Sequence, residues 1–129
     1  MVTGPKWLPP GAVLAMHDRQ LAEHGGGEGI RDAGLLESAL QRPVNKLAYG
    51  EPDLFALAAA YAYGIARNHP FVDGNKRTAL VVSLTFLKLN GLRMTSTQAE
   101  NVAVFLALAA GELDEDALAA WLSEHAQKA

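Results

Sequence analysis

The stretch from His69 to Arg77 gathers, within nine residues, side chains that could move a phosphoryl or nucleotidyl group. A histidine such as His69 can accept a proton from an attacking hydroxyl near neutral pH. Asp73 offers the hard oxygen ligand that Mg²⁺ prefers when the ion also binds substrate phosphates. Phe71, between them, is expected to point inward and anchor the loop.

The second half of the stretch has the residue types of a phosphate cradle. Gly74 lets a ligand approach the backbone, and Asn75 can donate a hydrogen bond to a phosphate oxygen. Lys76 adds a point charge, and Arg77 adds a fork that binds two oxygens at once. A helix is expected to begin near Gly74, so its free N–H groups and positive end would face the same anion.

Each residue also has an ordinary interpretation: a surface histidine before proline, an aspartate N-cap and two solvated cations. The combination argues otherwise, because two cations in a first helical turn each oppose the helix dipole by about 0.3–1 kcal/mol. Stability alone would favour acidic residues there. The misfit between Lys76-Arg77 and their position predicts an anionic ligand.

Two apolar segments flank this stretch and must position it. Residues 53–68 and 76–90 are apolar on nearly every side, which is typical of buried helices. Pro70 disfavours helical geometry at the residue before it and so ends the first helix. Val81 and Val82 leave a strand as an alternative for the second segment, but its length favours a helix.

Apolar spacing and capping residues predict the remaining helices. One covers residues 12–24 and ends at a simple glycine-rich turn, 25–29; a second runs from Asp32 to Pro43. Segment 44–52 is expected to be a loop or short hairpin. Two more helices cover 99–110, after a Thr97–Glu100 capping box, and 115–124. The prediction is an all-α, compact bundle of about six helices, two of them central, forming one domain over residues 1–129.

The composition narrows the function. The chain has 129 residues, no cysteine and a formal net charge of −3. Disulfides, thiolate zinc sites and a cysteine nucleophile are excluded, and the charge argues against nucleic-acid binding by this chain alone. The longest apolar stretches, 54–60 and 102–110, are shorter than the roughly 20 residues of a membrane helix. Residues 1–5 lack the features of a secretory leader, so a cytoplasmic protein is expected.

The central stretch resembles the Fic/Doc family, whose pattern is His-Pro-Phe-x-x-Gly-Asn-x-Arg. The matching residues are His69, Pro70, Phe71, Gly74, Asn75 and Arg77. Residues 16–18, 53–55 and 76–80 are similar to the death-on-curing (Doc) branch. Members that transfer AMP usually have glycine where this chain has Lys76, and often arginine where it has Leu80. The resemblance to the Doc branch implies transfer of the γ-phosphate of ATP to a protein hydroxyl.

The resemblance also implies individual roles: His69 as general base, Asp73 on Mg²⁺, the segment Gly74 to Arg77 on phosphates, and Arg67 as an auxiliary residue. It implies a translation elongation factor as the target, and a cognate antitoxin whose helical segment packs over the site. AMP transfer remains an alternative activity. A non-catalytic module that binds an antitoxin or another partner remains an alternative of a different class.

Three further patterns carry less weight. Segment 43–52 corresponds by position to the family's flap, which pairs with an extended target segment. Ser96, Glu100 and Asn101 match a short inhibitory pattern, which we interpret as chance because Glu100 already serves a helix cap. His17 could complete a metal triad with His69 and Asp73, but nothing in the sequence directs it there.

Overall fold

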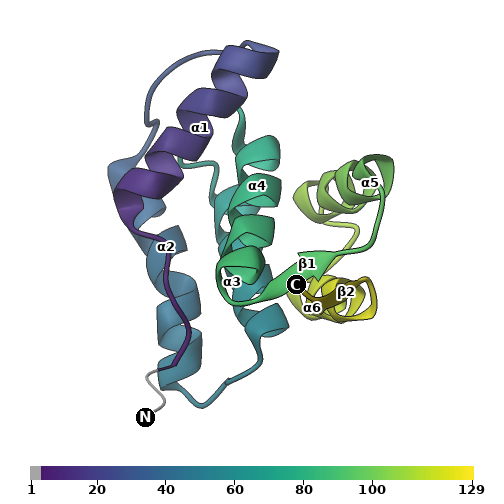
Figure 1. The fold of residues 1–129 in the computed structure, drawn as a ribbon. Helices are drawn as coiled ribbons and strands as arrows, with labels where there is room; N and C mark the ends of the chain where they lie inside the picture. Colours follow the sequence, from purple (N-terminus) through teal and green to yellow (C-terminus); the bar gives the residue numbers. More distant parts are fainter. Residues whose placement is uncertain (1–3) are drawn as a thin grey trace.

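Six helices and two short strands make up the part of the chain described by the computed structural model, residues 4–129 (Figure 1). They are α1 (Pro10–His24), α2 (Ala33–Ala48), α3 (Leu54–Asn68), α4 (Asn75–Leu89), β1 (Leu92–Met94), α5 (Gln98–Ala109), α6 (Glu115–Glu124) and β2 (Ala126–Lys128). The predicted all-α fold is confirmed. The interpretation of residues 1–5 falls partly outside the described residues.

Helix α3 is the central element of the bundle and packs against α2, α4, α5 and α6. Most of its residues are buried, and six of the buried ones are alanines. Such small side chains let neighbouring helices approach from several directions. At Gly64 an added Cβ would lie 3.0 Å from the Cα of Ala39 on α2, so this helix pair is packed almost backbone to backbone.

Helix α2 does not end at Pro43 as predicted but continues to Ala48, with the proline inside it. A proline within a helix removes one hydrogen bond and normally costs about 3 kcal/mol. Here the apolar stripe of Leu36 and Ala39 continues through buried Pro43 to Leu47, which packs against the core. Burial of that stripe against α3 therefore outweighs the local preference to stop.

The predicted helix starts are largely correct because the caps are local. Asp32, Asp53 and Asp114 each accept a backbone N–H of the helix that follows. Thr97 and Glu100 form the full capping box at α5. The strand alternative for residues 76–90 is wrong, since 75–89 are helical.

The strands form one antiparallel pair in which Arg93 lies opposite Gln127.

Among residues 4–129, no helix combines the length and apolar character needed to cross a bilayer.

One ion cluster joins α6 to α2 across the bundle. The carboxylate of Glu115 accepts hydrogen bonds from Arg42 and, at 2.8 Å, from Lys46. Burial by itself raises the pKa of the Glu115 carboxyl, but the two cations outweigh it and hold that pKa below its usual range.

Replacing Glu115 with glutamine should lower the free energy of unfolding at pH 7 by about 1 kcal/mol. A carboxyl whose pKa is lowered by folding stabilises above its unfolded pKa, about 4.3, and loses that contribution as the pH falls through the folded value. The difference between wild type and Glu115→Gln in urea unfolding should therefore shrink toward zero in acid. Glu124→Gln, at an exposed position of the same helix, is the control. A difference that grows in acid would contradict the assignment.

Candidate active site

The loop between α3 and α4 is closed by the side chain of Asn75. Its amide Nδ2 donates to the carbonyl of Phe71 at 3.0 Å, and its Oδ1 accepts from the N–H of Phe71 at 3.0 Å. Asn75 is 8% exposed and Phe71 is fully buried. One N–H and one lone pair of the amide thus hold the loop, which leaves the second N–H for the phosphate contact expected from the sequence.

His17, on α1, supports the same loop from the other side. Its ring stacks on Phe71, with centroids 3.8 Å apart and planes 9° apart, and its Nε2 lies 2.8 Å from the carbonyl oxygen of Asp73. A carbonyl only accepts, so Nε2 carries the proton and donates. Within residues 4–129, no three histidine, cysteine or acidic side chains are grouped to bind a metal. Through these contacts the buried ring of His17 braces the loop.

A third support is the glycine segment, residues 25–32, which connects α1 to α2 beside the loop. Val72 donates its N–H to the carbonyl of Gly29, and Ile30 forms an antiparallel bridge with Phe71. A Cβ added at Gly26 would lie 2.7 Å from a carboxylate oxygen of Asp73. The glycines are needed for this close approach, so the segment is more than the simple turn expected from the sequence.

Residues 43–52, where the family's flap was expected, lie away from the loop between α3 and α4. Residues 44–48 belong to α2, and the connection after them leads to the start of α3, at the end of the bundle opposite the loop (Figure 1). The extended segment that pairs with the loop is the glycine segment. The positional assignment of the flap to 43–52 is therefore wrong, because α2 continues past Pro43 and leads to the end of the bundle away from the loop that contains His69 (Figure 1).

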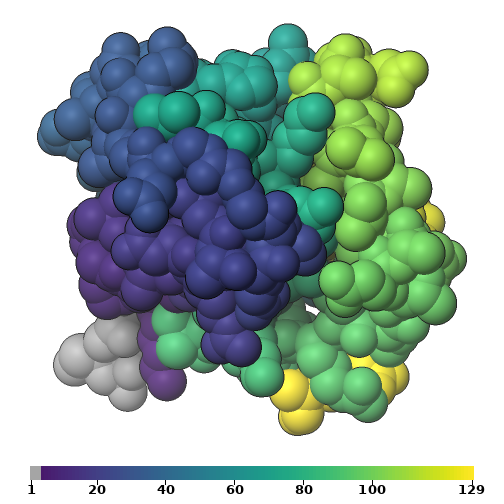
Figure 2. Space-filling model, turned by 90° about the horizontal axis from the view of Figure 1, so that it is seen from above, coloured from purple at the N-terminus to yellow at the C-terminus, as the bar shows by residue number. Residues whose placement is uncertain are grey.

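The loop and the first turn of α4 enclose a cavity of about 280 Å³, here called the catalytic pocket. Its walls bring together most of the expected site residues: His69, Val72, Asp73, Gly74, Asn75, Lys76 and Arg77. In Figure 2, which views this end of the molecule, the teal part of the chain that contains them reaches the surface between dark blue and green segments. His69, Asp73 and both cations are exposed.

At the N-terminus of α4, as expected from the sequence, cations occupy a turn in which acidic residues would be favoured. Its N-cap, Gly74, is left-handed with φ of 77°, makes no side-chain cap, and no acidic residue follows in the first turn. Lys76 and Arg77 stand there instead. Unpaired N–H groups and two cations at one helix end form a strongly anion-attracting surface.

Asp73 has the donor chemistry for Mg²⁺. Its carboxylate accepts the N–H of Gly74 at 2.8 Å and that of Gly27 at 3.4 Å, which orients it while it stays exposed in the pocket. One oriented carboxylate beside a phosphate-binding surface suits an ion that completes its shell with substrate phosphates and water.

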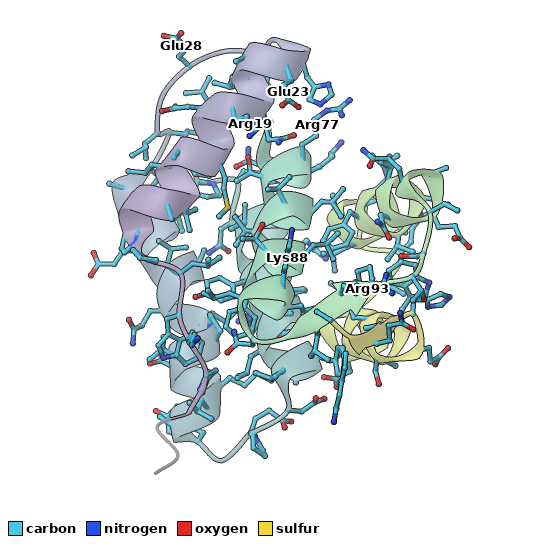
Figure 3. All side chains as sticks on the ribbon, in the orientation of Figure 1. Arg19, Glu23, Glu28, Arg77, Lys88 and Arg93 are labelled. Atoms are coloured by element: carbon cyan, nitrogen blue, oxygen red, sulfur yellow. The ribbon has the colours of Figure 1, made fainter. Side chains whose placement is uncertain are left out.

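A larger cavity, about 710 Å³, adjoins the catalytic pocket and shares Lys76 and Arg77 with it. We call it the α1–α4–α5 groove. Its rim includes Arg19 and Glu23, which pair with each other; its wall is apolar, and Leu106 is 49% exposed there. Arg77 lies within 3.4 Å of the His24 ring and near Glu23 (Figure 3).

Two expected or suspected residues lie elsewhere. The guanidinium of Arg67 sits over the Tyr63 ring at 5.6 Å and beside Gly111, outside the lining of the catalytic pocket. Glu100 of the short inhibitory pattern serves the α5 cap, and its pKa is lowered first of all by the N–H of Thr97. Neither side chain joins the cluster around His69.

The family is established by comparison with known proteins. Residues 7–87 match the Fic/DOC family, and the chain belongs to it. It is 40% identical over 88 residues to "Protein kinase doc" of Escherichia phage P1, covering 67% of this chain and 70% of that protein. It is 45% identical over 75 residues to "Toxin Doc" of Mycolicibacterium smegmatis (strain ATCC 700084 / mc(2)155), covering 56% of this chain and 57% of that one.

The brace formed by His17 yields a prediction. His17→Phe keeps a ring on Phe71 but removes the donor to Asp73, so unfolding should cost about 1 kcal/mol less free energy. Amide exchange of residues 71–75 should accelerate selectively. His125 stacks on Trp121 and lies 2.8 Å from its carbonyl, so His125→Phe is a matched control. Equal exchange in the loop for both variants would rule out the brace.

Proposed function

We propose that this protein is the toxin of a toxin–antitoxin pair and a Mg·ATP-dependent phosphotransferase. It would move the γ-phosphate of ATP to a serine or threonine hydroxyl of a translation elongation factor, in the cytoplasm. The observation that carries the proposal is the catalytic pocket, in which His69 and Asp73 face an uncapped helix N-terminus bearing Lys76 and Arg77. The name of the phage relative, "Protein kinase doc", supports the reaction type, and the resemblance to the Doc branch supports the target.

The chemistry needs little beyond positioning and charge. The acceptor hydroxyl oxygen attacks the γ-phosphorus while its proton passes to the imidazole of His69. The bond from phosphorus to the bridging oxygen breaks, and ADP leaves with that electron pair. Lys76, Arg77 and the free N–H groups of α4 hold the phosphate oxygens. Asp73 would hold Mg²⁺, which when bound would neutralise charge on the phosphates.

Labelled ATP distinguishes this reaction from its alternatives. With the protein, Mg²⁺ and a purified elongation factor, label from the γ position should enter the target and label from the α position should not. His69→Ala should reduce transfer at least about 10²-fold, the lower range for acid–base catalysis. Incorporation of α label would instead establish AMP transfer. Growth arrest by an Asp73→Ala variant would favour a non-catalytic binding module.

The α1–α4–α5 groove is the proposed binding site of the antitoxin helix. Its apolar wall and exposed Leu106 suit an amphipathic helix, and a helix bound there would lie beside the cations that the groove shares with the catalytic pocket. An occupant that engages Lys76 or Arg77 would exclude the nucleotide phosphates.

Leu106→Glu should therefore weaken antitoxin binding at least about tenfold, the effect of about 1.4 kcal/mol, in calorimetry with the purified antitoxin. Leu89→Glu is the matched control, since Leu89 is 41% exposed and lies outside the groove. Equal binding by the two variants would place the antitoxin elsewhere.

A further inference from the structure

His69, the proposed catalytic base, has an unfavourable backbone conformation. Within residues 4–129, His69 is the one non-glycine residue with positive φ, at 50°. A left-handed conformation is sterically unfavourable for such a residue, and the following proline further disfavours helical geometry. Pro70 also has no N–H, so it cannot donate the hydrogen bond that commonly closes a helix ending in a left-handed residue.

Arg31, in the glycine segment, donates hydrogen bonds to other carbonyls at this end of α3. Its Nε donates to the carbonyl of His69 at 2.6 Å, and its Nη2 donates to the carbonyl of Asn68 at 2.8 Å. Its own N–H donates to the carbonyl of Pro70 at 2.7 Å. One residue thus binds three consecutive carbonyls, at the negative end of the α3 dipole where a cation is favoured.

The anchor of Arg31 is itself rigid. The next residue, Asp32, also donates its N–H to the carbonyl of Pro70, and its side chain caps α2 through the N–H of Leu35. Arg31 therefore directly precedes the N-cap of α2, a helix that packs along α3. A planar guanidinium attached to a fixed backbone can hold two neighbouring carbonyls in one orientation.

We propose that Arg31 is the positioning residue of the catalytic base: its fork holds His69 in the left-handed conformation that keeps the imidazole in the catalytic pocket. Arg31 acts through His69 and touches no reacting atom. The kinetic part of this inference rests on the proposed phosphotransferase activity, whereas the structural part does not.

Arg31→Met keeps the length of the side chain and removes the fork. We expect kcat to fall about 10²-fold, the loss typical of a displaced catalytic group, with the KM for ATP within about threefold of wild type. The kcat of Arg31→Lys, which keeps the charge but not the fork, should lie between that of wild type and that of Arg31→Met. Arg93→Met is the matched control, because Arg93 is exposed on β1 and well apart from Arg77 (Figure 3). A kcat for Arg31→Met equal to that of Arg93→Met would overturn the proposal.

A second measurement needs no activity. The chain has four histidines, so the ring signal of His69 can be assigned by its loss in His69→Ala. That signal should shift in Arg31→Met and return toward its wild-type position in Arg31→Lys, at temperatures where every variant is folded. An unmoved His69 signal in Arg31→Met would overturn the proposal whatever the protein transfers. If the signal moves but wild type transfers no phosphate, the positioning role stands and the proposed function fails.

Discussion

The open N-terminus of α4 is the constraint on which the site depends. A glycine N-cap in place of an aspartate or serine leaves the first N–H groups unpaired, and two cations in the same turn add to the positive end instead of neutralising it. Such an end is stable only when the surrounding structure holds it rigidly. An anion bound there would relieve both the unpaired donors and the charge repulsion.

Rigidity comes from three side chains that reach one short loop from different parts of the chain. Asn75 closes it from α4, His17 from α1 and Arg31 from the glycine segment. Each of them binds backbone atoms of the loop, so none of them occupies the side chain of His69 or Asp73. Phe71, fully buried beneath, ties the backbone to the core. The loop therefore exposes its reactive groups on a fixed frame.

How much could be predicted from the sequence follows from the range of each interaction. Caps such as Asp32 and Asp114 act within three residues, and the all-round apolar character of α3 is visible directly, so these elements were predicted correctly. The extension of α2 past Pro43 depends on burial against α3, which local preferences do not encode. Likewise, the supporting contacts of His17 and Arg31 span 56 and 38 residues. No spacing rule connects such pairs: the sequence suggested His17 only as a possible metal ligand and gave no signal for Arg31.

The position of Lys76 and Arg77 between two cavities links the two halves of the proposed function. The catalytic pocket and the α1–α4–α5 groove share these cations, so a ligand in either cavity competes for the same charge. Under the proposed function, inhibition would require no conformational change: a helix in the groove that engaged Arg77 would withdraw a proposed phosphate-binding group while the frame stayed in place. Since the frame depends on His17 and Arg31 and not on the cations, substitutions of the cations should separate binding from loop geometry.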